Sequence, residues 1–174
     1  MAQVRQIAQL GQPVLRGVAS RVSLPASDEV RTLVDDMLAT MREANGVGIA
    51  APQVFEPLAV FIVASRPNPR YPNAPLMEPE VVVNPEVMEQ AEAVEKGWEG
   101  CLSIPGIRGE VPRPTQVRVR YQTLEGATVE KEFDGFVARV FLHENDHLHG
   151  IVFLDRLETT RDIITEKEFQ ARMA

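Results

Sequence analysis

The sequence predicts an α+β fold in which short, mostly antiparallel β-sheets pack around a central helix. Three observations support this prediction: a helical pattern lies near the N-terminus, several short apolar or alternating segments follow it, and a second helical segment comes after them. Strands that follow one another without intervening helices favour antiparallel pairing, because parallel pairing needs a long crossover. The length of 174 residues suits one core, so we expect a single domain over residues 1–174.

Residues 1–26 are expected to form an irregular arm with a short helical turn at Pro13. Ser27 is a favourable N-cap, and apolar residues then recur at helical spacing until Asn45. The following segment, G-V-G-I-A-A-P-Q at residues 46–53, lacks the G-K-[ST] of a phosphate-binding loop. We interpret it as a tight turn whose small residues allow close approach of a backbone or a ligand.

The central part of the chain predicts strands. Residues 58–64 form an apolar run typical of a buried strand, and the prolines of residues 65–80 predict a surface loop. A strand at residues 81–83 is expected to end at Asn84 and its proline, and loose alternation in residues 87–96 predicts another strand.

Clean alternation in residues 117–121 and 129–133 predicts a hairpin, with its turn at Glu125 and the following glycine. The last segment, residues 161–174, predicts a short helix of mixed charge.

Composition and charge limit the classes of function. Eighteen basic against 25 acidic residues leave a net charge of −7, which disfavours direct, specific nucleic-acid binding. No apolar run has the roughly 18 residues of a membrane span, and the N-terminus lacks the apolar region of a signal peptide. A single cysteine excludes an internal disulfide and fits a reducing compartment. We therefore expect a cytoplasmic protein.

Residues 136–150, F-V-A-R-V-F-L-H-E-N-D-H-L-H-G, are expected to form one helix that a glycine ends. The helix carries His143, Glu144 and His147 in an H-E-x-x-H pattern. Side chains four residues apart share a helix face, so both imidazoles can bind one metal ion while Glu144 acts on a water as a general base. Chance histidines are the alternative, but all three histidines of the chain lie between His143 and His149.

A catalytic metal ion usually has three protein ligands and one position open for water. The candidates for the third ligand are Cys101, in W-E-G-C-L-S-I-P-G, and a downstream carboxylate such as Glu166 or Glu168. A lone cysteine is more often a small buried hydrophobe, but two helical histidines need a partner and a thiolate suits transition metals. We favour Cys101, because little chain follows the helix in which to order a further ligand.

Three separated motifs make the sequence resemble the peptide deformylase family. They are G-V-G-I-A-A-P-Q at residues 46–53, E-G-C-L-S at residues 99–103 and H-E-x-D-H at residues 143–147, in the order of that family. The resemblance covers nearly the whole chain. One departure is Leu142, where the family commonly has glutamine, and its side chain is expected to point away from the metal.

The resemblance implies a divalent metal ion held by Cys101, His143 and His147. The native ion of the family is usually Fe²⁺, and Zn²⁺, Ni²⁺ or Co²⁺ can substitute for it. It also implies that Glu144 is the general acid and base in removing the formyl group from N-formylmethionyl nascent polypeptides, with release of formate.

The resemblance further implies that the side-chain amide of Gln53 and the backbone N–H of Leu102 stabilise the oxyanion. A transient ribosome contact is implied as well. Family members that dock there use a basic C-terminal helix, whereas Arg161, Lys167 and Arg172 alternate here with acidic residues.

The methionine side chain of such a substrate needs an apolar pocket, and our candidates are Val47, Gly48, Phe136 and Val140. The last two share the helix face of His143, although ordinary core packing gives the same spacing. The backbone of Gly48 could pair with the peptide by strand addition.

Three polar residues keep two interpretations each. Asp146 is either a solvated helix charge or a support for a metal ligand. His149 lies either on the surface or behind the ligands, and Arg108 either holds the cysteine segment or is an exposed charge.

Two competing functions also stay open: a zinc peptidase with a glutamate ligand, and a metal-binding module without catalysis. Formate release from a formylated peptide, compared with the unformylated peptide, distinguishes them from a deformylase.

Overall fold

The computed structural model of the chain describes residues 1–174 and contains three α-helices, eight strands and four short 3-10 turns. The helices are α1 (Asp28–Glu43), α2 (Gly135–His147) and α3 (Glu166–Met173). The strands are β1 (Gly48–Ala50), β2 (Val60–Ser65), β3 (Met77–Gln90), β4 (Val94–Cys101), β5 (Ile104–Pro114), β6 (Gln116–Gln122), β7 (Thr128–Asp134) and β8 (Ile163–Thr165). The 3-10 turns are Pro13–Arg16, Ala51–Val54, Phe153–Arg156 and Thr160–Asp162.

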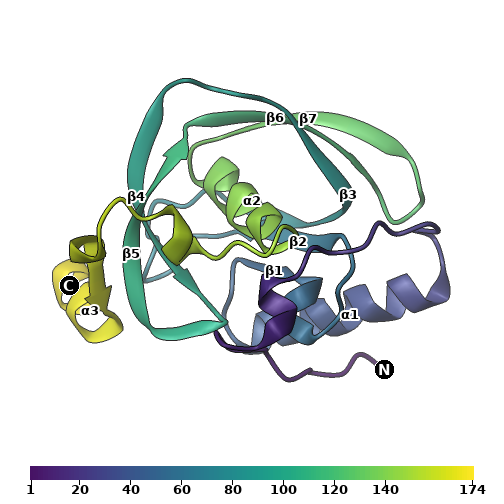
Figure 1. The fold of residues 1–174 in the computed structure, drawn as a ribbon, viewed down its shortest axis with the longest axis horizontal. Coiled ribbons are helices and arrows are strands. Elements are labelled where there is room, and N and C mark those ends of the chain that lie inside the picture. The colour runs from purple at the N-terminus through teal and green to yellow at the C-terminus, as the bar shows by residue number, and fades with distance from the viewer.

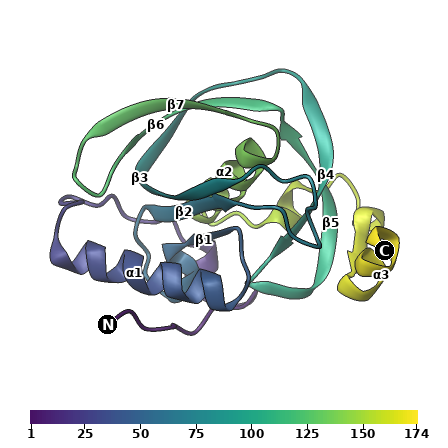
Figure 2. The same ribbon diagram turned by 180° about the vertical axis from the view of Figure 1, so that it is seen from behind.

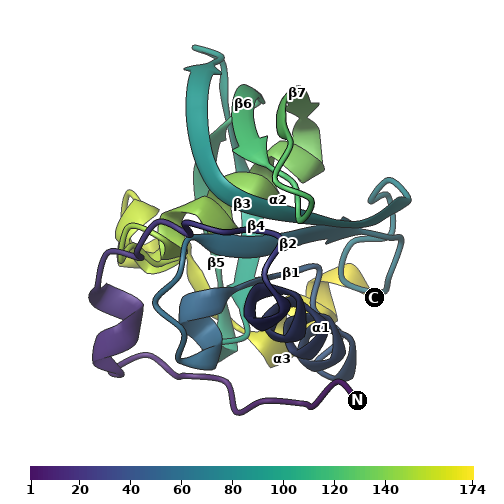
Figure 3. The same cartoon turned by 90° about the vertical axis from the view of Figure 1, so that its right-hand side faces the viewer.

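Two antiparallel sheets surround α2. The larger has the strand order β1-β2-β3-β6-β7, and the smaller has the order β4-β5-β8. In Figure 1, α2 lies in the middle of the molecule, with β6 and β7 above it and β4 and β5 at one side. Figure 3 shows the same helix behind the long, curved β3. The predicted α+β class, with antiparallel sheets around a central helix, is confirmed. None of the helices combines the length and apolar character needed to cross a lipid bilayer.

Strand β2 is apolar along most of its length because helices cover both faces of its sheet. Successive side chains of a strand point to opposite faces. Val60 and Ile62 pack in a cluster with α1, whereas Phe61 and Val63 pack in a second cluster with α2. Figure 2 shows α1 lying along the outside of β1 and β2. The sheet therefore connects the core around α1 to the core that holds α2.

Helix α1 starts and stops as the sequence predicts. The Ser27 hydroxyl accepts a hydrogen bond from the backbone N–H of Val30 at 3.3 Å, which satisfies one free donor of the first turn. After Glu43, Asn45 adopts a left-handed conformation with φ of 53°, and the chain leaves the helix. The predicted hairpin is also confirmed, because β6 and β7 pair in register from Gln116 with Asp134 to Gln122 with Thr128.

Strand β3 corrects two predictions. It begins at Met77, inside the predicted loop of residues 65–80, and it continues past Asn84 instead of ending there. Asn84 has a φ of 51° at an irregularity in the pairing with β6, so the strand bends without ending. Its side-chain amide bonds the backbone N–H and carbonyl of Val22, each at 2.8 Å, and reaches Gln122. These long-range partners hold an asparagine–proline pair within a strand.

The predicted strand at residues 87–96 is wrong as one element. The chain turns after Gln90 and starts β4 at Val94, so the alternating residues belong to two strands of different sheets. Strand β5 was not predicted because it contains Pro105, Pro112 and Pro114. Its pairing with β8 covers only its middle, residues 107–109, so Pro112 and Pro114 lie where β5 pairs with β4 alone.

The ends of the last two helices also differ from the predictions. Helix α2 ends at His147, and Gly150 follows three residues later with a φ of 70°. The predicted helix of residues 161–174 is shorter, because residues 163–165 pair with β5 as β8 before α3 begins. The Thr165 hydroxyl then caps α3 by accepting from the backbone N–H of Glu168 at 3.3 Å.

The N-terminal arm is irregular, as predicted, and is held by hydrogen bonds to the rest of the fold. One carboxylate of α1, Asp36, accepts from the backbone N–H of Gln3 at 2.7 Å and from the Arg5 side chain at 2.8 Å. Further along, the N–H of Leu10 donates to the carbonyl of Ser103 at 2.8 Å. The arm thus reaches from α1 to the segment that follows β4.

Replacing Asp36 with alanine should destabilise the fold, because the side chain is buried and accepts charge-assisted bonds. We expect a loss of about 1–3 kcal/mol in the free energy of unfolding, measured by urea denaturation at pH 7. The hydrogen bond from Gln3 and the contacts with Arg5 lower the pKa of Asp36. Its contribution is therefore present above the unfolded-state pKa and disappears as the pH falls through the lower folded-state pKa.

Glu56 provides the matched control, since it binds the same Arg5 side chain at 2.8 Å but has 41% of its side chain exposed. Glu56→Ala should cost about 0–1 kcal/mol. Equal losses for the two variants would show that burial of Asp36 contributes nothing.

Candidate active site

Helix α2 and the end of β4 bring three potential metal ligands together. His143 and His147 lie one turn apart on α2, and Cys101 is the last residue of β4. Their ligand atoms all lie within 4.8 Å of one another, and the Cys101 Sγ is 3.4 Å from Nε2 of His147. Both histidines are buried, and the cysteine is half-buried. The three side chains therefore form a cluster at the surface of a buried helix.

The donor set and its surroundings fit a divalent transition metal. His143 directs Nδ1 at the Glu99 carboxylate, 2.8 Å away, so that Nε2 keeps its lone pair for a metal. Burial lowers the pKa of His147, which favours the neutral imidazole that binds a metal. Burial also lowers the pKa of His143, but its hydrogen bonds with Cys101 and Glu99 raise that pKa overall. Two imidazoles and a thiol suit zinc, iron, cobalt and nickel equally well in donor type.

Glu144 lies against the first strand. Its Oε1 would be 2.5 Å from a Cβ atom built at Gly48, so only glycine fits at this position of β1. The other carboxylate oxygen of Glu144 is buried without a hydrogen-bond partner. Burial raises the pKa of the carboxyl to about 7. A carboxyl with a pKa near neutrality can both accept and donate a proton at working pH.

A buried chain of charges supports His143. The Glu99 carboxylate receives two hydrogen bonds from Arg113, both at 2.9 Å, and one from Arg139 at 2.9 Å. Burial alone raises the pKa of Glu99, but the charge of Arg113 and the His143 hydrogen bond lower it overall. Arg113 also donates to Asp146 at 2.6 Å. Asp146 is therefore a buried support that acts through an arginine, not a solvated helix charge.

The side-chain amide of Gln53 has a fixed orientation. Its Oε1 accepts from the backbone N–H of Ala50 at 2.9 Å, so the NH₂ group must face the other way. That group lies 3.1 Å from the Ser103 hydroxyl and 3.5 Å from Cys101 Sγ. Gln53 thus caps its own turn and presents a donor to the cysteine segment, and Leu102 lies between the two residues that this donor contacts.

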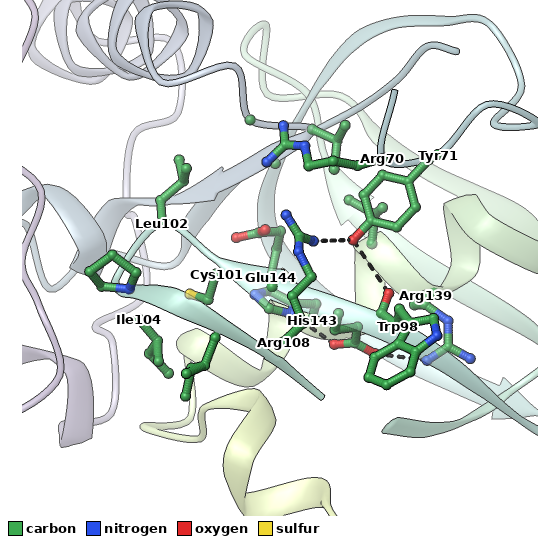
Figure 4. A pocket seen from close by; sticks show the side chains of 18 of the residues that line it. Arg70, Tyr71, Trp98, Cys101, Leu102, Ile104, Arg108, Arg139, His143 and Glu144 are labelled. Carbon is green, nitrogen blue, oxygen red and sulfur yellow. Dashed lines mark hydrogen bonds and ion pairs between the residues drawn. The ribbon is translucent and has the colours of Figure 1, made fainter. Parts of the chain in front are cut away.

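A cavity of about 350 Å³ opens onto the cluster. Figure 4 shows Cys101, His143 and Glu144 together, with Trp98 and Arg139 farther along the same pocket. All the residues that we expected to contact substrate line it, as do Gln53 and Leu102; the expected pocket residues are Val47, Gly48, Phe136 and Val140.

The other polar residues that the sequence analysis singled out are not part of the ligand cluster. Arg108 is buried, packs against Gly100, and donates to Glu166 at 2.6 Å and to the Tyr71 hydroxyl at 2.8 Å. Glu166 is thus paired with an arginine, and Glu168 is exposed on α3, so neither belongs to the ligand cluster. His149 is exposed, lies just after α2, and its ring bonds the backbone carbonyl of Asn145 in that helix.

Comparison with known proteins gives the family. The family model described as polypeptide deformylase matches residues 4–162. Peptide deformylase 2 of Nostoc sp. is 49% identical over 164 residues, which cover 94% of this chain and 92% of the relative. Peptide deformylase 2 of Shewanella oneidensis is 50% identical over 162 residues, covering 93% and 89%. The chain belongs to the polypeptide deformylase family.

Solved structures agree with this assignment. A Met-Ala-Ser-bound class I type b peptide deformylase from Acinetobacter baumannii aligns with a TM-score of 0.88 and 50% identity, over 90% of this chain and 100% of that one. The peptide deformylase of Thermotoga maritima aligns with a TM-score of 0.80 and 36% identity, over 90% and 99%. The deformylase fold predicted from the three motifs is confirmed.

Leu142 is buried in the core cluster between α2 and the larger sheet. It does not line the cavity beside the cluster, which agrees with the expectation that its side chain points away from the metal.

Sequence reasoning missed several residues of this deformylase site. Glu99 lies two residues before Cys101 on β4, and strand periodicity could have placed both side chains on one face. Arg113 and Tyr71 gave no such signal, because they reach the site from β5 and from the loop before β3. Arg139 lies one turn before His143 on the same helix, which is a signal that the helical pattern does carry.

Glu99→Gln should weaken metal binding, because it removes the charge that orients His143 through Nδ1. Changing such a supporting carboxylate typically lowers metal affinity by about 10–100-fold. The affinity for Zn²⁺ would be measured by competition with a chromogenic chelator, on protein shown to be folded by circular dichroism. Glu166→Gln is the control, since Glu166 lines the same cavity and pairs with a buried arginine but does not contact the cluster. Unchanged affinity in Glu99→Gln would contradict this role.

Proposed function

We propose that the chain is a metal-dependent hydrolase that removes the formyl group from N-formylmethionyl peptides and releases formate, with residues 1–174 acting as one catalytic domain. The observation that carries this proposal is the convergence of Cys101, His143 and His147 beside the buried carboxylate of Glu144, at a cavity that Cys101, His143 and Glu144 line. The Met-Ala-Ser peptide in the Acinetobacter relative supports a peptide substrate.

Cys101, His143 and His147 would hold a divalent metal ion, and we propose Fe²⁺ as the native ion, with Zn²⁺, Ni²⁺ or Co²⁺ able to substitute. When bound, such an ion lowers the pKa of a coordinated water and polarises the formyl carbonyl. The ligand atoms of the thiol and both imidazoles already lie within 4.8 Å of one another, so little rearrangement is needed to bind a metal ion.

Glu144 is the proton carrier of the proposed mechanism. Its buried carboxylate accepts a proton from the attacking water, and the water oxygen forms a bond to the formyl carbon. Glu144 then gives this proton to the amine nitrogen as the carbon–nitrogen bond breaks. Formate and a free N-terminal methionine are the products. The raised pKa of Glu144 suits both halves of this transfer.

Gln53 and Leu102 would stabilise the oxyanion that forms on the formyl carbonyl. The Gln53 NH₂ group is held toward the cysteine segment by the Ala50 hydrogen bond, so this donor is oriented before substrate arrives. The backbone N–H of Leu102 would supply the second donor. Fixed donors that meet developing charge are worth about a hundred- to a thousandfold each in turnover.

The peptide would lie along β1. This strand is at the edge of the larger sheet, with β2 on one side only, so an extended peptide can add to its free side. Val47 and Gly48 would bind the backbone, and the methionine side chain would enter the apolar part of the cavity at Phe136 and Val140. Backbone pairing would tolerate many sequences after the first residue.

A function on nascent chains would place the protein in the cytoplasm, and a transient ribosome contact belongs to the same proposal. Family members that dock on the ribosome use a basic C-terminal helix. The C-terminal helix of this chain, α3, contains Lys167 and Arg172 but also Glu166 and Glu168. The contact would therefore depend less on positive charge than in relatives with a basic tail.

Formate release from formyl-Met-Ala by metal-loaded protein tests the proposal directly, with unformylated Met-Ala as the peptidase control. Glu144→Gln should keep the metal and lose about 100- to 10,000-fold in turnover, because only the proton carrier is removed. Cys101→Ala should lose the metal itself. Release of alanine from Met-Ala would favour a zinc peptidase, and no reaction with either peptide would favour a non-catalytic metal module.

The proposed iron form should lose activity in air faster than the nickel form, because a thiolate beside Fe²⁺ is prone to oxidation. Half-lives of formate release would be compared after loading the same apoprotein anaerobically with each metal. Equal decay of the two forms would contradict an iron–thiolate site.

A further inference from the structure

Two cavities lie next to each other in this protein. The first, of about 350 Å³, is lined by Cys101 and His143 of the ligand cluster, and the second, of about 370 Å³, is lined by none of the three cluster residues. The two share one wall, whose residues line both cavities: Arg70, Tyr71, Trp98, Phe136 and Arg139. The second cavity continues toward α3, where Phe169 and Met173 line it. The wall thus lies between the first cavity, which we call the reactive chamber, and the second cavity.

Arg139 is a firmly fixed member of this wall. Its guanidinium donates to the Val111 carbonyl at 2.7 Å, the Glu95 carbonyl at 2.8 Å and the Glu99 carboxylate at 2.9 Å. These acceptors belong to β4 and β5, whereas Arg139 belongs to α2. A planar guanidinium with three acceptors in different directions has little freedom to move aside.

Strand β4 is shaped to receive this guanidinium. A Cβ atom built at Gly97 would lie 2.7 Å from Cζ of Arg139 and 2.8 Å from its Nε. Only glycine therefore allows the strand and the charged group to meet without a gap. Arg139 closes the space between α2 and β4 at this point.

The apolar part of the reactive chamber leads to Arg139. Phe136 and Val140 line the chamber from α2, one turn apart on that helix, and Arg139 lies between them in the sequence. Figure 4 shows Arg139 and Trp98 at one end of the pocket and Cys101 at the other. A substrate side chain that extends past Val140, in the direction away from the cluster, therefore approaches the guanidinium of Arg139.

We propose that Arg139 is a specificity-determining residue that sets the greatest length of the first side chain of the substrate. This inference rests on the proposed deformylase function and adds a residue to it. A side chain of methionine length ends before the guanidinium, whereas a longer or bulkier one must displace a charged group that is held by three acceptors. Removing Arg139 joins the two cavities and extends the chamber toward α3.

Arg139 can be changed without removing the support of His143. Glu99 keeps both hydrogen bonds from Arg113 at 2.9 Å when Arg139 is absent, so its carboxylate stays paired. Arg156 supplies a matched control, because it is also an arginine that pairs with a buried carboxylate of the same charge network, Asp146, but it lines neither cavity.

The test compares kcat/KM for formylated dipeptides that begin with norleucine, methionine, homophenylalanine or tryptophan, each followed by alanine. For the wild-type protein, kcat/KM should be at least about tenfold lower with homophenylalanine or tryptophan than with methionine. Arg139→Ala should reduce this discrimination by about tenfold or more, mainly through a lower KM for the bulky substrates. Arg156→Ala should keep the wild-type ratio between the substrates.

Folding and metal content would be measured for each variant, and Arg139→Leu, which keeps an apolar stem, replaces Arg139→Ala if the latter does not fold. The proposal is overturned if wild type shows no discrimination, if neither Arg139 variant changes it, or if Arg156→Ala changes it equally. Wild-type protein that releases no formate from any of the four peptides would instead refute the proposed function.

Discussion

The structure of the site depends on one buried carboxylate, that of Glu99, which is bonded by side chains from two other elements. Arg113 of β5 donates two hydrogen bonds to it, Arg139 of α2 donates one, and His143 of α2 contributes Nδ1. A charge that is removed from water is tolerated only when it is paired and hydrogen-bonded. The ion pairs therefore determine how β4, β5 and α2 pack against one another, and this packing brings the end of β4 close to the two histidines.

Glycines make that arrangement physically possible. Gly48 of β1, and Gly97 and Gly100 of β4, each face a charged side chain from another element, namely Glu144, Arg139 and Arg108. In every case an added Cβ atom would lie within 2.7 Å of a side-chain atom of that group. The strands around the cavity thus approach charged groups as closely as backbone can, and those three charged groups line the cavity beside its apolar residues.

Local patterns predicted the elements whose partners are near in the sequence. The helix after Ser27, the apolar β2 and the β6–β7 hairpin are correct because capping, periodicity and turn residues act over a few positions. The errors fall where distant residues decide the outcome. Asn84 continues a strand because Val22 and Gln122 bond its side chain, and a short pairing with β5 turns residues 163–165 from helix into strand.

The sequence by itself determined the α+β class, the helix with its two histidines, Cys101 as the candidate for the third metal ligand, and the family. These follow from short motifs and from helical periodicity, which are contained in stretches of consecutive residues. Only the tertiary structure decided that Glu99, Arg113 and Asp146 form one buried chain, and that Arg139 lies in the wall shared by two cavities. The reason is physical: the partners of a buried charge come from whichever elements pack around it, and sequence separation does not record that packing.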